Sequence, residues 1–215
     1  MPVKWAFDEL IDKLQSRLMG NLPGAQAHDR MKVIPMGPIK PFFDNKMPPK
    51  SGSVLILLFP HEGEVFFPLT ERPEYVGTHS GQISLPGGKA EFGEDAIATA
   101  LREGQEEIGI DPAQVQIIGR LSEFFVIPSN FLVTPIVGYI KSKPVFVPDP
   151  VEVKKIILGN ISALLDDQAI RTKEIVVAGR FHLEAPHFEI EEKIVWGATA
   201  MMLNELREIL KHSIH

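Results

Sequence analysis

Residues 82–109 join a short strand pattern to a long helical pattern through a proline–glycine–glycine turn, which limits the ways this part of the chain can fold. Residues 82–85 read as a strand that ends at Pro86, Gly87 and Gly88. Residues 94–108 follow the helical period, and Gly109 is expected to end the helix because glycine adopts the left-handed conformation easily. The sequence therefore predicts a strand, a tight turn and a helix in succession.

The other elements expected from hydrophobic periodicity are mostly strands. Helices are expected at residues 4–19, 161–167 and 197–211, and strands at 53–59, 65–70, 115–121, 123–127, 132–140, 151–157, 174–178 and 180–184. Residues 22–49 are rich in proline and glycine and are expected to form an extended arm. Many strands with few helices predict an α+β fold, an α/β/α sandwich with a mixed sheet between helices. We expect residues 1–50 to pack as a helix and arm on a domain formed by residues 51–215.

Composition argues against several classes of protein. A net charge of −6 argues against a general nucleic-acid binder, and the absence of cysteine excludes disulfides and cysteine–zinc sites. No apolar run approaches the roughly 20 residues that span a bilayer, and the first residues do not form a secretory signal. We therefore expect a cytoplasmic protein without a membrane or nucleic-acid partner. The extended arm is compatible with a homodimer.

The expected helix carries three glutamates on one face. Glu106 lies about 60° and Glu107 about 40° from Glu103 around a helix, on either side. The apolar positions Ile97, Leu101 and Ile108 are expected to form the opposite, buried face. Such runs are common on solvated helices, but carboxylates so close together repel, and a divalent cation would relieve that repulsion. The cluster thus indicates metal-assisted chemistry on a phosphate-bearing substrate.

Gly104 also falls on the expected buried face. A glycine in the middle of a helix is unfavourable by about 1 kcal/mol relative to alanine. We expect its role to be close packing of the helix backbone against a strand.

The spacing of the charged residues and glycines resembles the Nudix box. The pattern runs glycine, five residues, Glu, seven residues, Arg-Glu, two residues, Glu-Glu, one residue, glycine and an aliphatic residue. It is met by Gly88, Glu94, Arg102, Glu103, Glu106, Glu107, Gly109 and Ile110. One position departs, because Gly104 stands where the family usually has an apolar residue. The resemblance implies the Nudix fold and hydrolysis of a nucleoside diphosphate linked to another moiety.

Roles for individual residues follow from the same resemblance. It implies Mg²⁺ or Mn²⁺ as cofactor, bound by the three glutamates and the backbone carbonyl of Gly88. It implies a catalytic set of Glu103, Glu106, Arg102 and Glu94, in which Arg102 and Glu94 pair to fix the loop against the helix. It implies that Glu103 or a loop residue assists deprotonation of the attacking water, and Glu152 and Glu123 are candidate loop acids.

The segment before the box, residues 69–88, is similar to the corresponding motif of coenzyme A pyrophosphatases. The matching residues are Leu69, Thr70, Arg72, Gly81, Pro86, Gly87 and Gly88. The resemblance implies contacts with substrate from Arg72, His79, Gly81 and Gly87. Three positions depart, since Pro73 replaces a serine, Gly77 an arginine and Leu85 a phenylalanine. An arginine at position 77 could grip a phosphate with two hydrogen bonds, which glycine cannot.

Three functions follow as hypotheses. The first is cleavage of coenzyme A or acyl-coenzyme A into 4′-phosphopantetheine and adenosine 3′,5′-bisphosphate. The second is a Nudix hydrolase for ADP-ribose, NADH or another nucleoside diphosphate derivative, which the substitutions at positions 73 and 77 motivate. The third is a catalytically silent module that binds a nucleotide, against which the retained glutamates argue. Each hypothesis makes a small-molecule nucleotide the partner.

Overall fold

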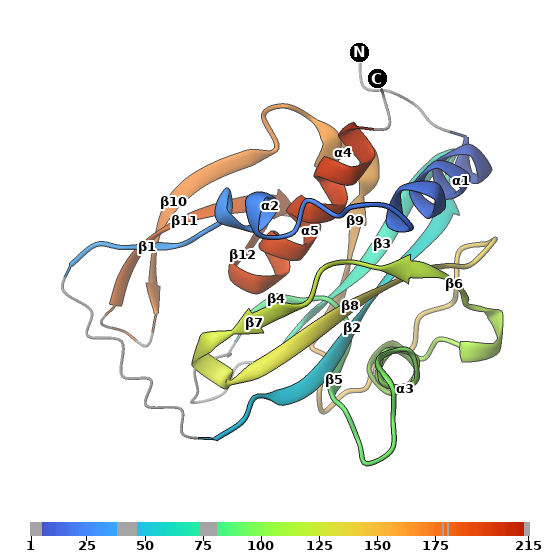
Figure 1. The fold of residues 1–215 in the computed structure, drawn as a ribbon, viewed down its shortest axis with the longest axis horizontal. Helices are drawn as coiled ribbons and strands as arrows, with labels where there is room; N and C mark the ends of the chain where they lie inside the picture. Colours follow the sequence, from blue (N-terminus) through green and yellow to red (C-terminus); the bar gives the residue numbers. More distant parts are fainter. Residues whose placement is uncertain (1–5, 38–46, 74–80, 178, 180, 213–215) are drawn as a thin grey trace.

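The computed structural model describes residues 6–37, 47–73, 81–177, 179 and 181–212. These residues form a mixed sheet, a smaller second sheet and five helices (Figure 1). In chain order the helices and strands are α1 (Phe7–Leu18), α2 (Ala25–Asp29), β1 (Ile34–Pro35), β2 (Lys50–His61), β3 (Glu64–Glu71), β4 (Ile83–Ser84), β5 (Gly87–Lys89), α3 (Ala96–Ile108), β6 (Gln116–Arg120), β7 (Phe124–Val126), β8 (Phe131–Tyr139), β9 (Lys155–Asn160), α4 (Ile161–Leu165), β10 (Ile170–Val177), β11 (Phe181–Ile190), β12 (Lys193–Trp196) and α5 (Gly197–Lys211). Short 3₁₀ turns lie at Pro112–Gln114 and Ile127–Ser129.

The larger sheet has eight strands and is mixed. Its main path runs β4-β3-β2-β8-β6, with β5 paired to β2, β7 to β8 and β9 to β3. The pair β2–β8 is parallel, with Lys50 opposite Phe131 and Leu58 opposite Tyr139, and the other pairs are antiparallel. Since β2 is central, its side chains from Leu55 to Phe59 are fully buried, as expected for a strand covered on both faces.

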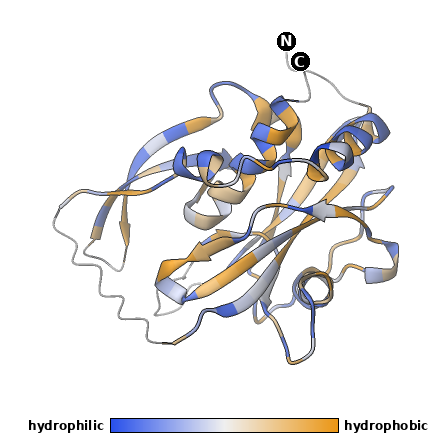
Figure 2. Ribbon diagram, viewed as in Figure 1, coloured by the Kyte–Doolittle hydropathy of each residue, from blue (hydrophilic) through white to orange (hydrophobic). Residues whose placement is uncertain are grey.

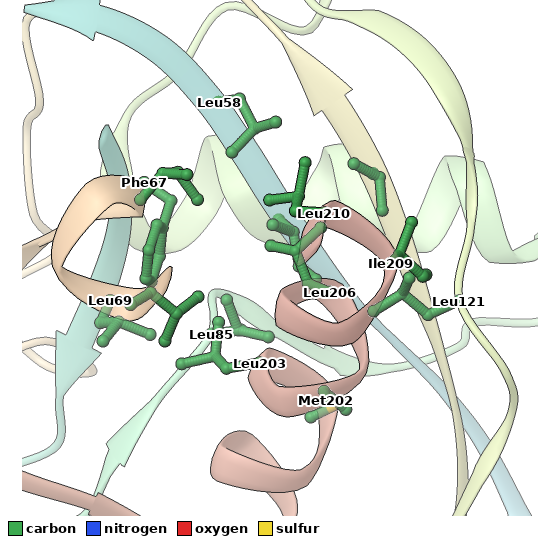
Figure 3. Close-up of a cluster of buried hydrophobic side chains, with 14 of the residues drawn as sticks. Leu58, Phe67, Leu69, Leu85, Leu121, Met202, Leu203, Leu206, Ile209 and Leu210 are labelled. Atoms are coloured by element: carbon green, nitrogen blue, oxygen red, sulfur yellow. The ribbon is translucent and has the colours of Figure 1, made fainter. Parts of the chain in front are cut away.

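Two hydrophobic clusters cover the faces of this sheet. The larger cluster joins β2 and β3 to α1, α4 and α5. Figure 3 shows part of it, with labels on Leu58, Phe67, Leu69, Leu85, Leu121, Met202, Leu203, Leu206, Ile209 and Leu210. The smaller cluster lies under α3 on the other face and contains Leu55, Leu57, Ala100 and Ile108. The hydropathy colouring of Figure 2 shows the same apolar strands between the helices. The predicted α+β class, with a mixed sheet between helices, is confirmed.

A second, four-stranded sheet was not predicted. It runs β1-β11-β10, with β12 also paired to β11, and every pair is antiparallel. The predicted hairpin at residues 174–184 is present but longer. The strand β12 was missed because the turn before it contains Glu191 and Glu192, both with positive φ (45° and 63°), in place of the usual glycine or asparagine.

Several local predictions need correction. The arm at residues 22–49 contains a short helix, α2, and the strand β1, which pairs with β11. The strand predicted at residues 151–157 begins only at Lys155, because the Asp149 side chain accepts hydrogen bonds from the amides of Val151 and Glu152 and bends the chain there. Within the part of the chain that the structure describes, no helix is long and apolar enough to cross a membrane.

Candidate active site

Gly87 and Gly88 bring the backbone of β5 against both β2 and α3. A Cβ atom at Gly87 would lie 2.3 Å from the carbonyl oxygen of Ser53, and Gly87 has a φ of 155°. A Cβ atom at Gly88 would lie 2.4 Å from the Glu103 carboxylate. Gly87 has no room for a side chain because the backbone of β2 is in the way, and a side chain at Gly88 would displace the Glu103 carboxylate, so the glycine pair allows this backbone to reach the carboxylates of α3.

The helix α3 is held in place by its ends and by one close contact. The Asp95 side chain accepts a hydrogen bond from the amide of Ala98, and Gly109 ends the helix in the left-handed conformation. A Cβ atom at Gly104 would lie 2.9 Å from the Cδ1 atom of Ile110 and 3.1 Å from the Cδ2 atom of Leu55 in β2. The predicted role of Gly104, close packing against a strand, is confirmed.

The buried face of α3 agrees only in part with the one expected. Ile97 is 41% exposed, whereas Glu107 is 2% exposed and is buried together with Ala100, Gly104 and Ile108. Gly104 and Ile108 are buried as expected, but the buried face turns away from Ile97 and Leu101 and towards Ala100 and Glu107. Glu107 therefore lies at the boundary between the sheet and the site, and it is not an exposed surface residue.

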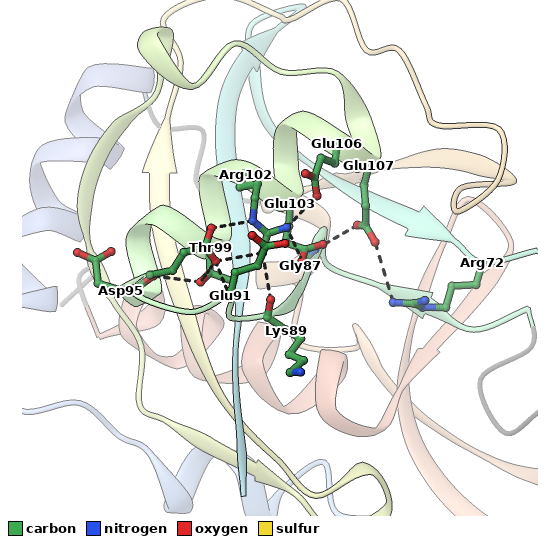
Figure 4. A network of polar contacts seen from close by, with 11 residues as sticks. Arg72, Gly87, Lys89, Glu91, Asp95, Thr99, Arg102, Glu103, Glu106 and Glu107 are labelled. Atoms are coloured by element: carbon green, nitrogen blue, oxygen red, sulfur yellow. Dashed lines mark hydrogen bonds and ion pairs between the residues drawn. The ribbon is translucent and has the colours of Figure 1, made fainter.

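Glu107 has two partners in this boundary (Figure 4). Its Oε2 atom accepts a hydrogen bond of 3.1 Å from the amide of Gly87, and its Oε1 atom lies 4.0 Å from the Nη2 atom of Arg72. Burial raises the pKa of Glu107 to about 7, although the Gly87 amide and Arg72 favour the charged form. Glu103 and Glu152 raise this pKa further by repulsion.

Arg102 organises the other carboxylates. Its guanidinium contacts Glu94 at 2.7 Å, Glu103 at 2.9 Å and Glu106 at 2.8 Å, and it donates to the carbonyl oxygen of Lys89 at 3.0 Å (Figure 4). The hydrogen bond from Arg102 lowers the pKa of Glu94 to about 2, and these carboxylates raise the pKa of Arg102. The predicted Arg102–Glu94 pair is present, and it ties the loop before α3 to the helix.

A second loop reaches the site from the segment before β9. The amide of Val147 donates to the carbonyl of Ile108 and the amide of Asp149 to that of Glu107, each at 3.0 Å, so this loop follows the end of α3. Burial raises the pKa of Glu103, Arg102 opposes this rise, and the charges of Glu106 and Glu152 add to it. The structure thus brings Glu152 close enough to influence Glu103 and Glu107, whereas Glu123 instead contacts Thr134 at 3.4 Å.

The predicted substrate-binding residues are only partly described. Arg72 lies beside Glu107, and its amide donates to the carbonyl of Gln82 at 3.0 Å. Gly81 has a φ of 65°, which favours glycine. Gly87 lies in β5 against Glu107. His79 and the departing position Gly77 lie outside the described residues.

The donor atoms suit a hard divalent cation, but they are not gathered around one point. Among the residues that the structure describes, no three acidic or histidine side chains are close enough together to hold a metal ion. Glu103 and Glu106 are turned onto Arg102, and Glu107 onto the Gly87 amide. Carboxylate oxygens are nevertheless the ligands that Mg²⁺ and Mn²⁺ prefer, and the crowded carboxylates Glu103 and Glu107 would be stabilised by a cation.

Comparison with known proteins identifies the family of this chain. Residues 49–154 match the NUDIX domain family. A Nudix hydrolase named NudL from Pectobacterium atrosepticum is 32% identical over 161 residues, which is 73% of this chain and 81% of that protein. The chain belongs to the Nudix hydrolase family. The matched range contains every box residue from Gly88 to Ile110.

Two other Nudix relatives are longer proteins. Nudix hydrolase 22, chloroplastic, from Arabidopsis thaliana is 37% identical over 163 residues, which is 72% of this chain and 53% of that protein. The peroxisomal coenzyme A diphosphatase NUDT7 from Mus musculus is 34% identical over 129 residues, which is 60% of this chain and 54% of that protein. This chain therefore spans about half the length of these two relatives. Their names give different compartments, so the cytoplasmic location stays a prediction.

A solved Nudix structure shares the fold. The Nudix hydrolase RenU from M. smegmatis superposes with a TM-score of 0.55, at 16% identity, over 79% of this chain and 92% of that chain. The match confirms the Nudix fold predicted from the box. At this identity it supports the fold alone.

Proposed function

We propose that this chain hydrolyses the phosphoanhydride bond of a nucleoside diphosphate derivative and that its substrate is coenzyme A or acyl-coenzyme A. The observation that carries the proposal is the set of box carboxylates on α3, held against the Gly87-Gly88 turn and organised by Arg102. Burying Glu107 does not stabilise a helix that has only a structural role, because burial and neighbouring carboxylates disfavour its charged form and raise its pKa. This arrangement is expected where charge has to be placed against a ligand.

The cofactor in this proposal is Mg²⁺ or Mn²⁺. Glu103, Glu106, Glu107 and the carbonyl of Gly88 would hold it, after the glutamates turn away from Arg102 and the Gly87 amide. When bound, the ion would neutralise charge on the diphosphate and lower the pKa of a water.

The chain's own residues would do the remaining chemistry. Arg102 and Glu94 hold the loop before α3 beside Glu103, because Arg102 is anchored to Glu94 and to the carbonyl oxygen of Lys89. Glu103 or Glu152 would accept a proton from the water whose oxygen attacks phosphorus. The bridging P–O bond then breaks, and each product keeps one of the two phosphates of the diphosphate. The raised pKa of Glu103 makes it a better proton acceptor than an ordinary surface carboxylate.

Support for coenzyme A as substrate comes from residues 69–88 and from a relative. Leu69, Thr70, Arg72 and Gly81 match the motif of coenzyme A pyrophosphatases, and the mouse relative is named as a coenzyme A diphosphatase. Gly77 supports the second candidate, a Nudix hydrolase for ADP-ribose or NADH, because an anchoring arginine is missing there. A silent binding module would have little reason to keep the carboxylates of α3.

The test is a substrate panel with a matched variant. Purified protein with Mg²⁺ or Mn²⁺ is incubated with coenzyme A, ADP-ribose and NADH, and the products are separated by chromatography. We expect 4′-phosphopantetheine and adenosine 3′,5′-bisphosphate from coenzyme A, and a loss of at least about 100-fold in rate for Glu103→Gln. Glu184→Gln, an exposed carboxylate of β11, is the control and should retain full activity. Cleavage of ADP-ribose or NADH without cleavage of coenzyme A would reject the substrate, and no cleavage of any compound would reject the activity.

A further inference from the structure

One row of paired residues runs from the candidate active site across the larger sheet, through β5, β2, β8 and β7 (Figure 1). Gly88, which lies against the Glu103 carboxylate, pairs with Ser53 of β2. Ser53 pairs in turn with Thr134 of β8, and its hydroxyl donates to the carbonyl oxygen of Thr134 at 2.7 Å. The Thr134 hydroxyl donates to a carboxylate oxygen of Glu123 at 3.4 Å. Glu103 and Glu123 therefore lie at the two ends of this row.

The side chains of this row point to the side of the sheet that carries α3. Paired residues of neighbouring strands share a face, and successive residues of one strand point to opposite faces. Leu55, two positions after Ser53, belongs to the hydrophobic cluster under α3. Leu132 lies two positions before Thr134 and pairs with Phe125 of β7. Leu132 and Phe125 thus share a face of the sheet with the glutamates of α3.

Two of these side chains form an apolar surface beside the row. Phe125 is 42% exposed, and its partner Leu132 is half-buried. Ile127, two positions after Phe125, is also exposed, at 49%. Figure 2 shows the same apolar character along β7. We call Phe125 and Leu132 the β7 platform. A ligand that covered it would bury apolar surface, which is favourable in water.

Strand spacing gives the distance between the β7 platform and the glutamates of α3. Neighbouring strands lie about 4.8 Å apart, and each residue of a strand rises by about 3.4 Å. Leu132 is two strands and two residues away from Gly88, and Phe125 is one strand further, so the platform lies roughly 12–16 Å from Gly88. The pantetheine arm of coenzyme A has the chain length of about four residues, which span about 14 Å when extended. A substrate with its diphosphate at α3 can therefore reach the platform with this arm.

Glu123 determines which end of the substrate suits the β7 platform. Its exposed carboxylate lies between Thr134 and the platform, two positions before Phe125. A negative charge there repels phosphate, and the adenosine end of coenzyme A carries a 3′-phosphate. The pantetheine arm is uncharged, and its amide N–H groups can donate to a carboxylate. Its methyl groups match the apolar side chains of the platform.

We propose that the β7 platform binds the pantetheine arm of the substrate while the diphosphate lies at the glutamates of α3. This inference rests on the proposed function and extends it. Phe125 and Leu132 would contact the substrate far from the bond that breaks, so they determine specificity and take no part in the chemistry. The adenosine end would then lie away from β7.

The two products of the proposed reaction test the inference, because each contains one end of the substrate. Calorimetry in Mg²⁺ is carried out with 4′-phosphopantetheine and with adenosine 3′,5′-bisphosphate. We expect Phe125→Ser to weaken binding of 4′-phosphopantetheine about tenfold and to leave binding of the bisphosphate unchanged. Phe125→Leu should retain most of the affinity, since it keeps an apolar side chain. Val176→Ser, which replaces a 53% exposed side chain of β10, is the control that should change neither affinity.

Other outcomes would overturn the inference. If Phe125 only packs β7 onto β8, Phe125→Ser will lower the melting temperature and affect both ligands alike. Equal changes for the two ligands, no change, or no binding of 4′-phosphopantetheine to wild type would each contradict the proposal. Weaker binding of the bisphosphate alone would place the adenosine end at the β7 platform, which also contradicts it.

This measurement is independent of turnover. A selective loss of 4′-phosphopantetheine binding in a protein that does not cleave coenzyme A would reject the proposed function and keep the binding site. Where coenzyme A is cleaved, Phe125→Ser should raise KM about tenfold with kcat unchanged. An unchanged KM would overturn the inference while the proposed function stands.

Discussion

Replacing Glu107 by glutamine should make the metal-free protein more stable at neutral pH while removing its activity. Burial holds the pKa of Glu107 at about 7, compared with 4.5 for an ordinary glutamate, so ionising it in the folded chain is unfavourable. The difference between these two pKa values corresponds to about 3 kcal/mol of lost folding stability at pH values above 7. Glutamine carries no charge there, and its amide oxygen can still accept the hydrogen bond from Gly87.

The sign of the pH dependence follows from the raised pKa. The folded chain favours the protonated carboxyl, so the contribution of Glu107 to stability is fully present below about pH 4.5. It is lost progressively as the pH rises towards about 7. Wild type without metal should therefore lose stability through this window, and Glu107→Gln should lack this loss. Bound Mg²⁺ should reduce the difference between the two proteins, because the cation favours the charged carboxylate.

The assay is urea denaturation in EDTA at several pH values between 5 and 8. The control is Glu106→Gln, because the Glu106 side chain is 57% exposed and loses only one contact to Arg102, about 0.5 kcal/mol. A Glu107→Gln variant that is less stable than wild type at pH 8, or that retains the wild-type pH slope, would refute this reasoning. Measured activity should fall by at least about 100-fold in magnesium.

Three further changes test the packing around the site. Arg102→Ala should lower stability by about 2 kcal/mol in thermal denaturation, since it removes the contacts that hold Glu94 to α3; an unchanged melting temperature would contradict this. Gly104→Leu should destabilise the protein by about 2 kcal/mol, because the added side chain overpacks against β2. Gly104→Ala should leave stability close to that of wild type, because the higher helix propensity of alanine offsets its contact with two terminal methyl groups. Equal effects of the two substitutions would contradict the packing argument. Glu205→Leu should lower the free energy of unfolding, measured in urea, by about 3 kcal/mol. The reason is that the fully buried carboxylate accepts hydrogen bonds from Gly24, His28 and Ser122. An unchanged free energy would show that these groups find other partners.

Features determined by neighbouring residues in the sequence could be predicted. The end of α3 at Gly109 and the Nudix box were readable because a helix end depends on a few consecutive residues, and the box is defined by spacing. The limits of β2 and β8 were close to the predicted ones, since both strands are apolar runs with clear boundaries. The two strands at the centre of the larger sheet could therefore be predicted from the sequence.

Features that depend on contact between distant segments could not be predicted. The burial of Glu107 arises because the turn at Gly87 approaches α3, and helical geometry alone placed this glutamate with its exposed neighbours. The contribution of Glu152 depends on the loop that follows the end of α3. The ion pairs of Glu71 with two lysines join segments more than 80 residues apart in the chain, and no periodicity in the sequence signals such a contact.

The parallel pairing of β2 with β8 has a consequence for synthesis on the ribosome. Lys50 lies opposite Phe131, so one edge of β2 finds its partner only after about eighty more residues have been made. At 5–20 residues per second this takes roughly 4–16 s, during which an apolar strand presents an unsatisfied edge. Nascent chains arrested before residue 131 should therefore associate with chaperones or with one another, and release should follow once β8 has emerged.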